Sequence, residues 1–148
     1  MAETARTANV VWNGGLGEGS GRVTGSTSGN LQNVGVSWKA RSTGEHGGNT
    51  SPEELIAAAQ ASCFSMALSG ALEGNETPPQ QLDVEATCTF TVDDSGPKIS
   101  GMVLNVSGQV DGVDQATFEE MAGQAGQNCP VSAALRGNVD VTVNATLK

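Results

Sequence analysis

SPEELIAAAQASCFSMALSGA, residues 51–71, is the one long segment of this chain with the pattern of a buried helix. Ser51 suits the N-cap, Pro52 suits the first helical position because it has no N–H to lose, and Glu54 completes a capping box. Apolar residues then recur at three- and four-residue steps on one face: Leu55, Ile56, Ala59, Cys63, Met66 and Ala67. Most other positions are Ala or Ser, so this helix can pack on several sides.

The composition excludes several kinds of partner. The 148 residues carry a formal net charge of −9 with only seven Lys and Arg, so nucleic acid and anionic membranes are poor partners. No run approaches the roughly 18 apolar residues of a membrane span, and the N-terminus lacks the apolar region of a secretory signal. We therefore expect a cytoplasmic protein with a single domain, residues 1–148.

The segments around this helix predict a mixed fold. Strands are predicted at residues 8–13, 21–26, 33–41, 82–92, 99–110 and 138–147. Asp114 is expected to cap a second helix, and Pro130 to open a short third one. Strands and helices in this order form an α+β pattern. One chain supplies too little sheet to cover the central helix, so we expect a homodimer that buries the central helices between sheets.

Cys63 has two interpretations. It is either a small buried hydrophobic residue or a nucleophilic thiolate, which needs a cation and access to solvent. Arg41 is the candidate cation because it ends a predicted strand just before the loop into the helix. Glu53 is the candidate partner of Arg41, since the capping box already accounts for Glu54. The alternatives are a surface arginine and a carboxylate that only favours the helix dipole.

Cys129 precedes Pro130 at the cap of the short helix, where free N–H groups lower a thiol pKa. Its alternative is a turn residue with no role. A thiolate and an accessible second thiol are the set that a thiol peroxidase needs. The first thiolate attacks a peroxide oxygen and becomes a sulfenic acid, and the second thiol condenses with it to a disulfide.

The remaining reactive side chains suggest weaker alternatives. Cys88 alternates inward on a predicted strand, so we expect it to belong to the core. His46, the only histidine, lies in a glycine-rich loop. A metal site made of His46, Cys63 and Cys129 lacks the usual close ligand spacing. A hydrolase lacks a positioned base, with His46 as the one candidate.

The run SPEELIAAAQASCFSMALS, the Arg41 strand end before it and NCPVSAAL after it resemble the OsmC branch of the OsmC/Ohr family. The resemblance covers nearly the whole chain. It implies an intertwined α+β homodimer with the central helices between two mainly antiparallel sheets. It also implies a cytoplasmic thiol peroxidase that reduces organic hydroperoxides, needs no cofactor or metal, and takes electrons from a dithiol, with lipoylated proteins the favoured donor.

The resemblance also implies roles for four residues. By position, Cys63 resembles the peroxidatic cysteine, Cys129 the resolving cysteine, Glu53 the catalytic glutamate and Arg41 the activating arginine. The family's site lies at the dimer interface, so Arg41 of one subunit can serve the Cys63 of the other. The alternative function is a redox sensor or binding module that keeps the fold without turnover.

Two further expectations concern the surroundings of Cys63. Members of the OsmC branch commonly carry a His three positions before the peroxidatic cysteine, and this chain has Gln60 there. Leu55 and Met66 are expected to form an apolar wall beside Cys63. Such a wall would favour alkyl hydroperoxides over hydrogen peroxide, at roughly 0.8 kcal/mol per buried methylene.

Overall fold

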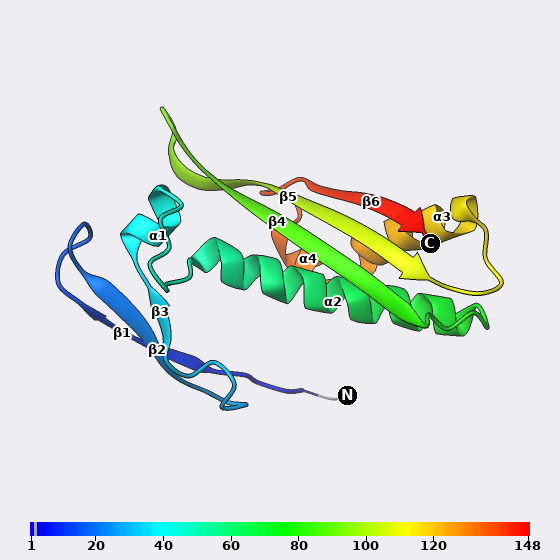
Figure 1. The fold of residues 1–148 in the computed structure, drawn as a ribbon, viewed down its shortest axis with the longest axis horizontal. Coiled ribbons are helices and arrows are strands. Elements are labelled where there is room, and N and C mark those ends of the chain that lie inside the picture. The colour runs from blue at the N-terminus through cyan, green and yellow to red at the C-terminus, as the bar shows by residue number, and fades with distance from the viewer. Residues whose placement is uncertain (2) are drawn as a thin grey trace. The chain divides into compact units, whose positions relative to one another are not determined.

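The computed structural model describes residues 1 and 3–148 and divides them into two compact units, Met1–Leu55 and Ile56–Lys148 (Figure 1). Each unit contains one three-stranded sheet, with strand order β1-β2-β3 in the first and β4-β5-β6 in the second. Helix α2 begins in the first unit and continues through the second. The predicted α+β class is confirmed.

The first unit is an antiparallel meander of β1 (Ala8–Asn13), β2 (Ser20–Ser26) and β3 (Val34–Val36). A glycine-rich loop joins β1 to β2. Among the described residues of this unit, the buried hydrophobic side chains are Val23 and Ala40. Larger apolar side chains remain on its surface: Val10, Val11, Trp12, Leu16 and Leu31. This unit therefore has apolar surface without an internal core to bury it.

The strand predicted over residues 33–41 is wrong beyond Val36. The chain turns at Ser37 into a short helix, α1 (Trp38–Ser42), which carries Arg41. The Ser37 hydroxyl accepts a hydrogen bond from the Ala40 backbone N–H at 3.1 Å and caps the helix. A serine that satisfies a free backbone donor in this way competes with strand pairing, so the apolar alternation was misleading here.

The long helix α2 (Pro52–Gly74) is confirmed, together with its N-cap. The Ser51 hydroxyl accepts from the Glu54 backbone N–H at 3.2 Å. The Glu54 carboxylate accepts from the Thr50 hydroxyl. Two carboxylates, Glu53 and Glu54, lie in the first turn, where the helix dipole favours negative charge.

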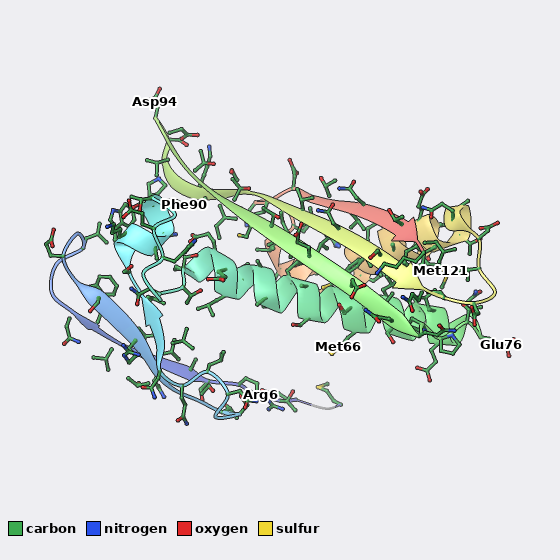
Figure 2. All side chains as sticks on the ribbon, in the orientation of Figure 1. Arg6, Met66, Glu76, Phe90, Asp94 and Met121 are labelled. Carbon is green, nitrogen blue, oxygen red and sulfur yellow. The ribbon has the colours of Figure 1, made fainter. Side chains whose placement is uncertain are left out.

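The buried stripe of α2 differs from the predicted face. It consists of four residues at four-residue steps, each fully buried: Gln60, Phe64, Leu68 and Leu72. The predicted face contained Met66, which is 70% exposed and points away from the β4-β5-β6 sheet (Figure 2). The larger side chains take the side that faces the core, because they bury more apolar area there. Ala and Ser carry too little area to determine the face.

Within the described residues, α2 is also the one helix long and apolar enough to cross a membrane. This differs from the expectation that no run approaches a membrane span. The core helix of a soluble protein passes the same test, and α2 packs its buried stripe into a protein core. The length and composition of α2 are therefore only weak evidence that it spans a membrane.

The second unit contains the main core. Strands β4 (Gln81–Asp93) and β5 (Gly96–Gln109) are antiparallel, and β6 (Val141–Leu147) runs parallel to β5. Helices α3 (Gln115–Asn128) and α4 (Pro130–Leu135) connect β5 to β6. The core is made by the α2 stripe, by β5 with the residue that follows it, and by α3. Its buried members are Phe64, Leu68, Leu72, Leu104, Val106, Val110, Phe118, Ala122 and Ala125. This packing positions α2 and α3 on a common core.

Gly126 of α3 lies where the helix approaches β6 closely. A Cβ at this position would meet Val143 Cγ2 at 2.7 Å. Gly123, one turn earlier in the same helix, has no neighbour within 4 Å of its Cβ position. Close packing therefore explains one helix glycine and leaves the other unexplained.

We expect Gly126→Ala to destabilise the protein by about 1–3 kcal/mol, because the methyl group overpacks against Val143. Gly123→Ala is the matched control and should stabilise it by up to about 1 kcal/mol, through helix propensity alone. Urea unfolding at equal protein concentration measures both changes. Stabilisation of similar size by both variants would contradict the close packing of α3 on β6.

Candidate functional site

The first unit holds an ion pair between Arg41 on α1 and Glu53 in the first turn of α2. Arg41 Nε donates to Glu53 Oε1 at 3.0 Å and to Oε2 at 3.2 Å, and Arg41 Nη2 donates to Oε1 at 2.7 Å. The Glu53 side chain is 7% exposed and that of Arg41 is 30% exposed. A two-pronged pair of this kind fixes the orientation of the guanidinium.

An apolar pocket adjoins Arg41 within the same unit. Its lining comes from β1, the loop after it, β3, α1 and the start of α2: Trp12, Leu16, Val36, Ser37, Trp38, Arg41 and Pro52. Two indole rings and one guanidinium therefore border one hollow. A ligand with a polar head and a hydrocarbon body matches this combination of surfaces.

The second unit brings Cys63 and Cys129 together, although they are far apart in sequence. Both are free thiols, and the Cys63 thiol donates a hydrogen bond to Cys129 Sγ. Cys63 is partly exposed on α2. Cys129 is the residue at which α3 ends and α4 begins, and it is 0% exposed. The expectation that Cys129 is an accessible thiol is therefore wrong for this chain, because its side chain points into the protein.

The two thiols differ in acidity. Burial raises the pKa of Cys63, and donation of its proton toward Cys129 raises that pKa further, with the Val131 backbone opposing. Burial also acts to raise the pKa of Cys129. Hydrogen bonds from the Cys63 thiol, from the backbone and hydroxyl of Ser132, and from the Val131 backbone outweigh it and lower that pKa. Within this unit, the negative charge of the pair is therefore better placed on Cys129 than on Cys63.

Gln60 and Ser132 complete the buried cluster around Cys129. Gln60 Nε2 donates to Ser132 Oγ at 2.7 Å and approaches Cys129 Sγ at 3.9 Å. Sequence reasoning noted Gln60 as a departure and missed Ser132. The signal for both was available: Gln60 interrupts a stripe of large apolar residues, and Ser132 lies one helical turn beyond Cys129.

Other candidates from the sequence do not join these clusters. Cys88 lies on β4 opposite Met102 of β5, and His46 is exposed in the loop before α2. Across residues 1 and 3–148, no group of His, Cys, Asp and Glu side chains is arranged to hold a metal ion. Met66 is 70% exposed in the subunit and Leu55 is half-buried, and the apolar wall of Leu55 and Met66 beside Cys63 stays a prediction.

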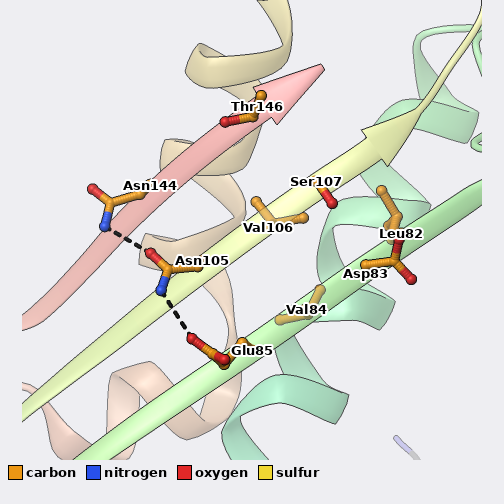
Figure 3. A pocket seen from close by; sticks show the side chains of 9 residues that line it. All are labelled: Leu82, Asp83, Val84, Glu85, Asn105, Val106, Ser107, Asn144 and Thr146. Carbon is orange, nitrogen blue, oxygen red and sulfur yellow. Dashed lines mark hydrogen bonds between the residues drawn. The ribbon is translucent and has the colours of Figure 1, made fainter. Parts of the chain in front are cut away.

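A further pocket lies on the polar face of the second sheet (Figure 3). A ladder of side chains crosses it, in which Asn105 Nδ2 donates to Glu85 Oε1 at 3.2 Å and Asn144 Nδ2 donates to Asn105 Oδ1 at 2.9 Å. Its lining contains no thiol and no cation. The hydrogen bonds link side chains of β4, β5 and β6 across this surface.

Comparison with known proteins identifies the family of this chain. A family model described as OsmC-like protein matches residues 44–144. The chain belongs to the OsmC family. It is similar to the protein named Peroxiredoxin OsmC of Escherichia coli strain K12, at 36% identity over 93% of this chain and 92% of that protein.

Other OsmC relatives extend the similarity. The organic hydroperoxide resistance protein-like 2 of Staphylococcus epidermidis is 34% identical over 99% of both chains. The crystal structure of the organic hydroperoxide resistance protein OhrB of Bacillus subtilis matches with a TM-score of 0.71 and 30% identity, covering 95% of this chain and 98% of that one. The predicted family and its fold are thereby confirmed.

We expect Glu53→Gln to destabilise this OsmC protein by about 2 kcal/mol, since it leaves the Arg41 charge without its buried carboxylate. Glu54→Gln is the matched control: it is adjacent, exposed and equal in charge, and should cost less than about 1 kcal/mol. Urea unfolding at one protein concentration compares them. Equal losses would mean that both carboxylates act only through the helix dipole.

Proposed function

We propose that this protein is a thiol-dependent peroxidase that reduces organic hydroperoxides to alcohols through Cys63 and Cys129. Membership of the OsmC family makes it a peroxide-reducing oxidoreductase. The observation that carries the finer mechanism is the contact between two free thiols, one partly exposed and one buried. The partly exposed Cys63 thiol can react with a peroxide. The buried Cys129 thiol, which is hydrogen-bonded to Cys63, can then react with the sulfenic acid that forms.

The reaction follows from this arrangement. The Cys63 thiolate attacks the outer peroxide oxygen, the O–O bond breaks, and the alkoxide takes a proton to become an alcohol. Cys63 is left as a sulfenic acid. Cys129 Sγ then attacks Cys63 Sγ, and an S–S bond forms as the S–O bond of the sulfenic acid breaks. The hydroxide leaves as water with the proton of the Cys129 thiol. A dithiol such as dihydrolipoamide returns the two electrons, and the family resemblance implies a lipoylated protein as its carrier.

Cys63 needs a cation, because burial and the contact with Cys129 both raise its pKa. The basic residues of the second unit are engaged elsewhere: Lys98 pairs with Asp93 at 2.6 Å, Arg136 donates to Gln127 O at 2.5 Å, and Lys148 pairs with Asp83. We assign the cation to Arg41, which Glu53 holds in a fixed orientation. Its guanidinium can stabilise the thiolate and bind the peroxide oxygen.

A homodimer is part of the proposal. The exposed apolar side chains on β1, and a helix α2 that is fully buried along one stripe only, leave more apolar surface than a stable monomer exposes. A second copy that covers these surfaces would join both units into one OsmC-like domain, residues 1–148. Arg41 would then serve the Cys63 of either its own or the partner subunit.

We assign the substrate tail to the apolar pocket beside Arg41. Trp12, Leu16 and Trp38 offer a hydrocarbon surface next to the guanidinium. An alkyl or fatty-acid hydroperoxide would place its tail there, with each buried methylene contributing about 0.8 kcal/mol. The three free cysteines agree with a reducing compartment, and we expect the cytoplasm.

Turnover of cumene hydroperoxide with dihydrolipoamide tests the two-cysteine mechanism. We expect Cys63→Ser to abolish the activity and Cys129→Ser to lose it at least 100-fold, roughly the loss of a step that requires a positioned thiol. A dimedone adduct on Cys63 should accumulate in Cys129→Ser, because the sulfenic acid has no partner. Cys88→Ser and His46→Ala are the controls and should keep full activity.

Two results would replace the proposal. Absence of turnover in the wild-type protein with every dithiol, together with a stable disulfide after peroxide treatment, would favour a redox sensor. Ester cleavage that depends on His46 would favour a hydrolase.

The pH dependence of Cys63 alkylation tests the role of Arg41. The wild-type midpoint should lie below the ordinary thiol pKa of about 8.5, because the guanidinium favours the thiolate. In Arg41→Met with Glu53→Gln, which leaves no lone buried carboxylate, the midpoint should rise above about 8.5. The sign follows because burial and Cys129 raise the pKa of Cys63 once the cation is gone, so less thiolate is present at neutral pH.

Iodoacetamide labelling with peptide mass spectrometry measures Cys63 alone. Arg41→Lys keeps the charge without the planar fork and should give an intermediate midpoint. Identical midpoints in the wild-type protein and the double variant would remove Arg41 from the mechanism.

A further inference from the structure

Gln60 is a fully buried amide in a position suited to an apolar residue. It begins the stripe that continues at Phe64, Leu68 and Leu72, all of which pack in the core. Its Oε1 is buried, and the described residues offer it no hydrogen-bond donor. A buried amide with an unsatisfied oxygen is less stable than an apolar side chain of the same shape. The amide therefore has a role other than packing.

The other end of the amide indicates that role. Gln60 Nε2 has two hydrogens, of which one points to Ser132 Oγ at 2.7 Å, while Cys129 Sγ lies 3.9 Å away. An amide N–H donates to a thiolate more strongly than to a thiol, because hydrogen bonds to charged groups are stronger. The cluster therefore favours a negatively charged Cys129.

The difference in burial between the cysteines determines when Cys129 becomes charged. After oxidation, a reductant can reach Cys63 Sγ, which is partly exposed, and not Cys129 Sγ, which is 0% exposed. Attack at Cys63 makes Cys129 the leaving group. The rate of such an exchange rises as the leaving thiol becomes more acidic. The surroundings of Cys129 therefore control the reductive half of the cycle.

We propose that Gln60 is a positioning residue for the reduction of the Cys63–Cys129 disulfide, in which its side-chain amide donates to Cys129 Sγ as this sulfur leaves as a thiolate. The inference rests on the proposed two-cysteine function. A thiolate of the dithiol reductant bonds to Cys63 Sγ, the Cys63–Cys129 bond breaks, and its electron pair stays on Cys129. The second thiolate of the dithiol then attacks the dithiol sulfur that is bonded to Cys63. Cys63 leaves as a thiolate and the dithiol is oxidised to a cyclic disulfide.

The lowered pKa of Cys129 agrees with this role. Burial opposes ionisation, and hydrogen bonds from Cys63, Ser132 and Val131 outweigh it. In the disulfide the Cys63 thiol is no longer a donor, so the remaining donors carry more of the leaving charge. Gln60 Nε2, which lies 3.9 Å from Cys129 Sγ, is a further donor from helix α2, where it also bonds to the Ser132 hydroxyl.

The test separates the two half-reactions. The disulfide is prepared with diamide, and its reduction by dihydrolipoamide is followed by rapid alkylation and intact mass. Gln60→Met, of similar length without a donor, should slow reduction about tenfold, the effect of losing one hydrogen bond to a charged group. Single-turnover oxidation of Cys63 by cumene hydroperoxide should stay within about twofold of the wild-type rate, because Cys129 is not yet reacting.

Gln60→His and Leu68→Met complete the design. Gln60→His restores an N–H donor and should recover most of the lost reduction rate. Leu68→Met alters the same core stripe two turns later without touching Cys129, and should leave the reduction rate unchanged. In a Cys63→Ser background, the ultraviolet thiolate absorbance of Cys129 should titrate about one pH unit higher with Gln60→Met. Subtracting the Cys63→Ser, Cys129→Ser protein removes the signal of Cys88.

Two results would overturn the role of Gln60. One is a reduction rate and a Cys129 titration that Gln60→Met leaves unchanged. The other is a slowing that Leu68→Met reproduces, which would reflect core packing alone. Diamide forms the disulfide without peroxide, so these readouts remain valid even if the wild-type protein is inactive on hydroperoxides. Such inactivity would contradict the proposed function and not the role of Gln60. Failure of diamide to join Cys63 to Cys129 would also overturn the inference.

Discussion

The packing of one face of α2 against the core of the second unit is the constraint on which the rest of the structure depends. Phe64, Leu68 and Leu72 are fully buried there with residues of β5 and α3. Once these three face inward, the rotation of the helix is set, because each residue advances by a fixed angle. Cys63, next to Phe64, must then lie at the margin of the core. Gln60, one turn before Phe64, must lie inside it, where α3 ends at Cys129.

The two thiols differ in how accessible they are and in how well their surroundings stabilise a negative charge. A buried sulfur surrounded by hydrogen-bond donors holds negative charge well and cannot be reached from outside. A partly exposed sulfur can be reached, but holds charge poorly while it donates a proton to its neighbour. One pKa unit corresponds to about 1.36 kcal/mol, which is the scale on which a nearby cation would have to act to move the charge from one sulfur to the other. The proposed function assigns that cation to Arg41, which the Glu53 carboxylate holds in one orientation.

The first unit carries the apolar surface on which the proposed dimer rests. Its buried hydrophobic residues are few, and its exposed ones include Trp12 and Leu16. A sheet of this size buries too little apolar area to be stable by itself. The formal charge of −9 keeps the remaining surface hydrated and limits association with polyanions. The apolar surfaces on β1 and α2 are therefore the ones available for a partner subunit.

The sequence by itself determined the long helix, its Ser51 cap, the strands of the second sheet and the short helix after Cys129, because each depends on local periodicity or a cap. It also indicated Cys63, Cys129, Arg41 and Glu53, mainly through the two cysteine motifs. Only the tertiary structure decided which face of α2 is buried, since Ala and Ser outnumber the large residues that set it. It alone placed Arg41 on a helix, because the Ser37 cap overrode an apolar alternation. The burial of Cys129 and its contacts with Gln60 and Ser132 join residues distant in sequence, and no local pattern records such contacts.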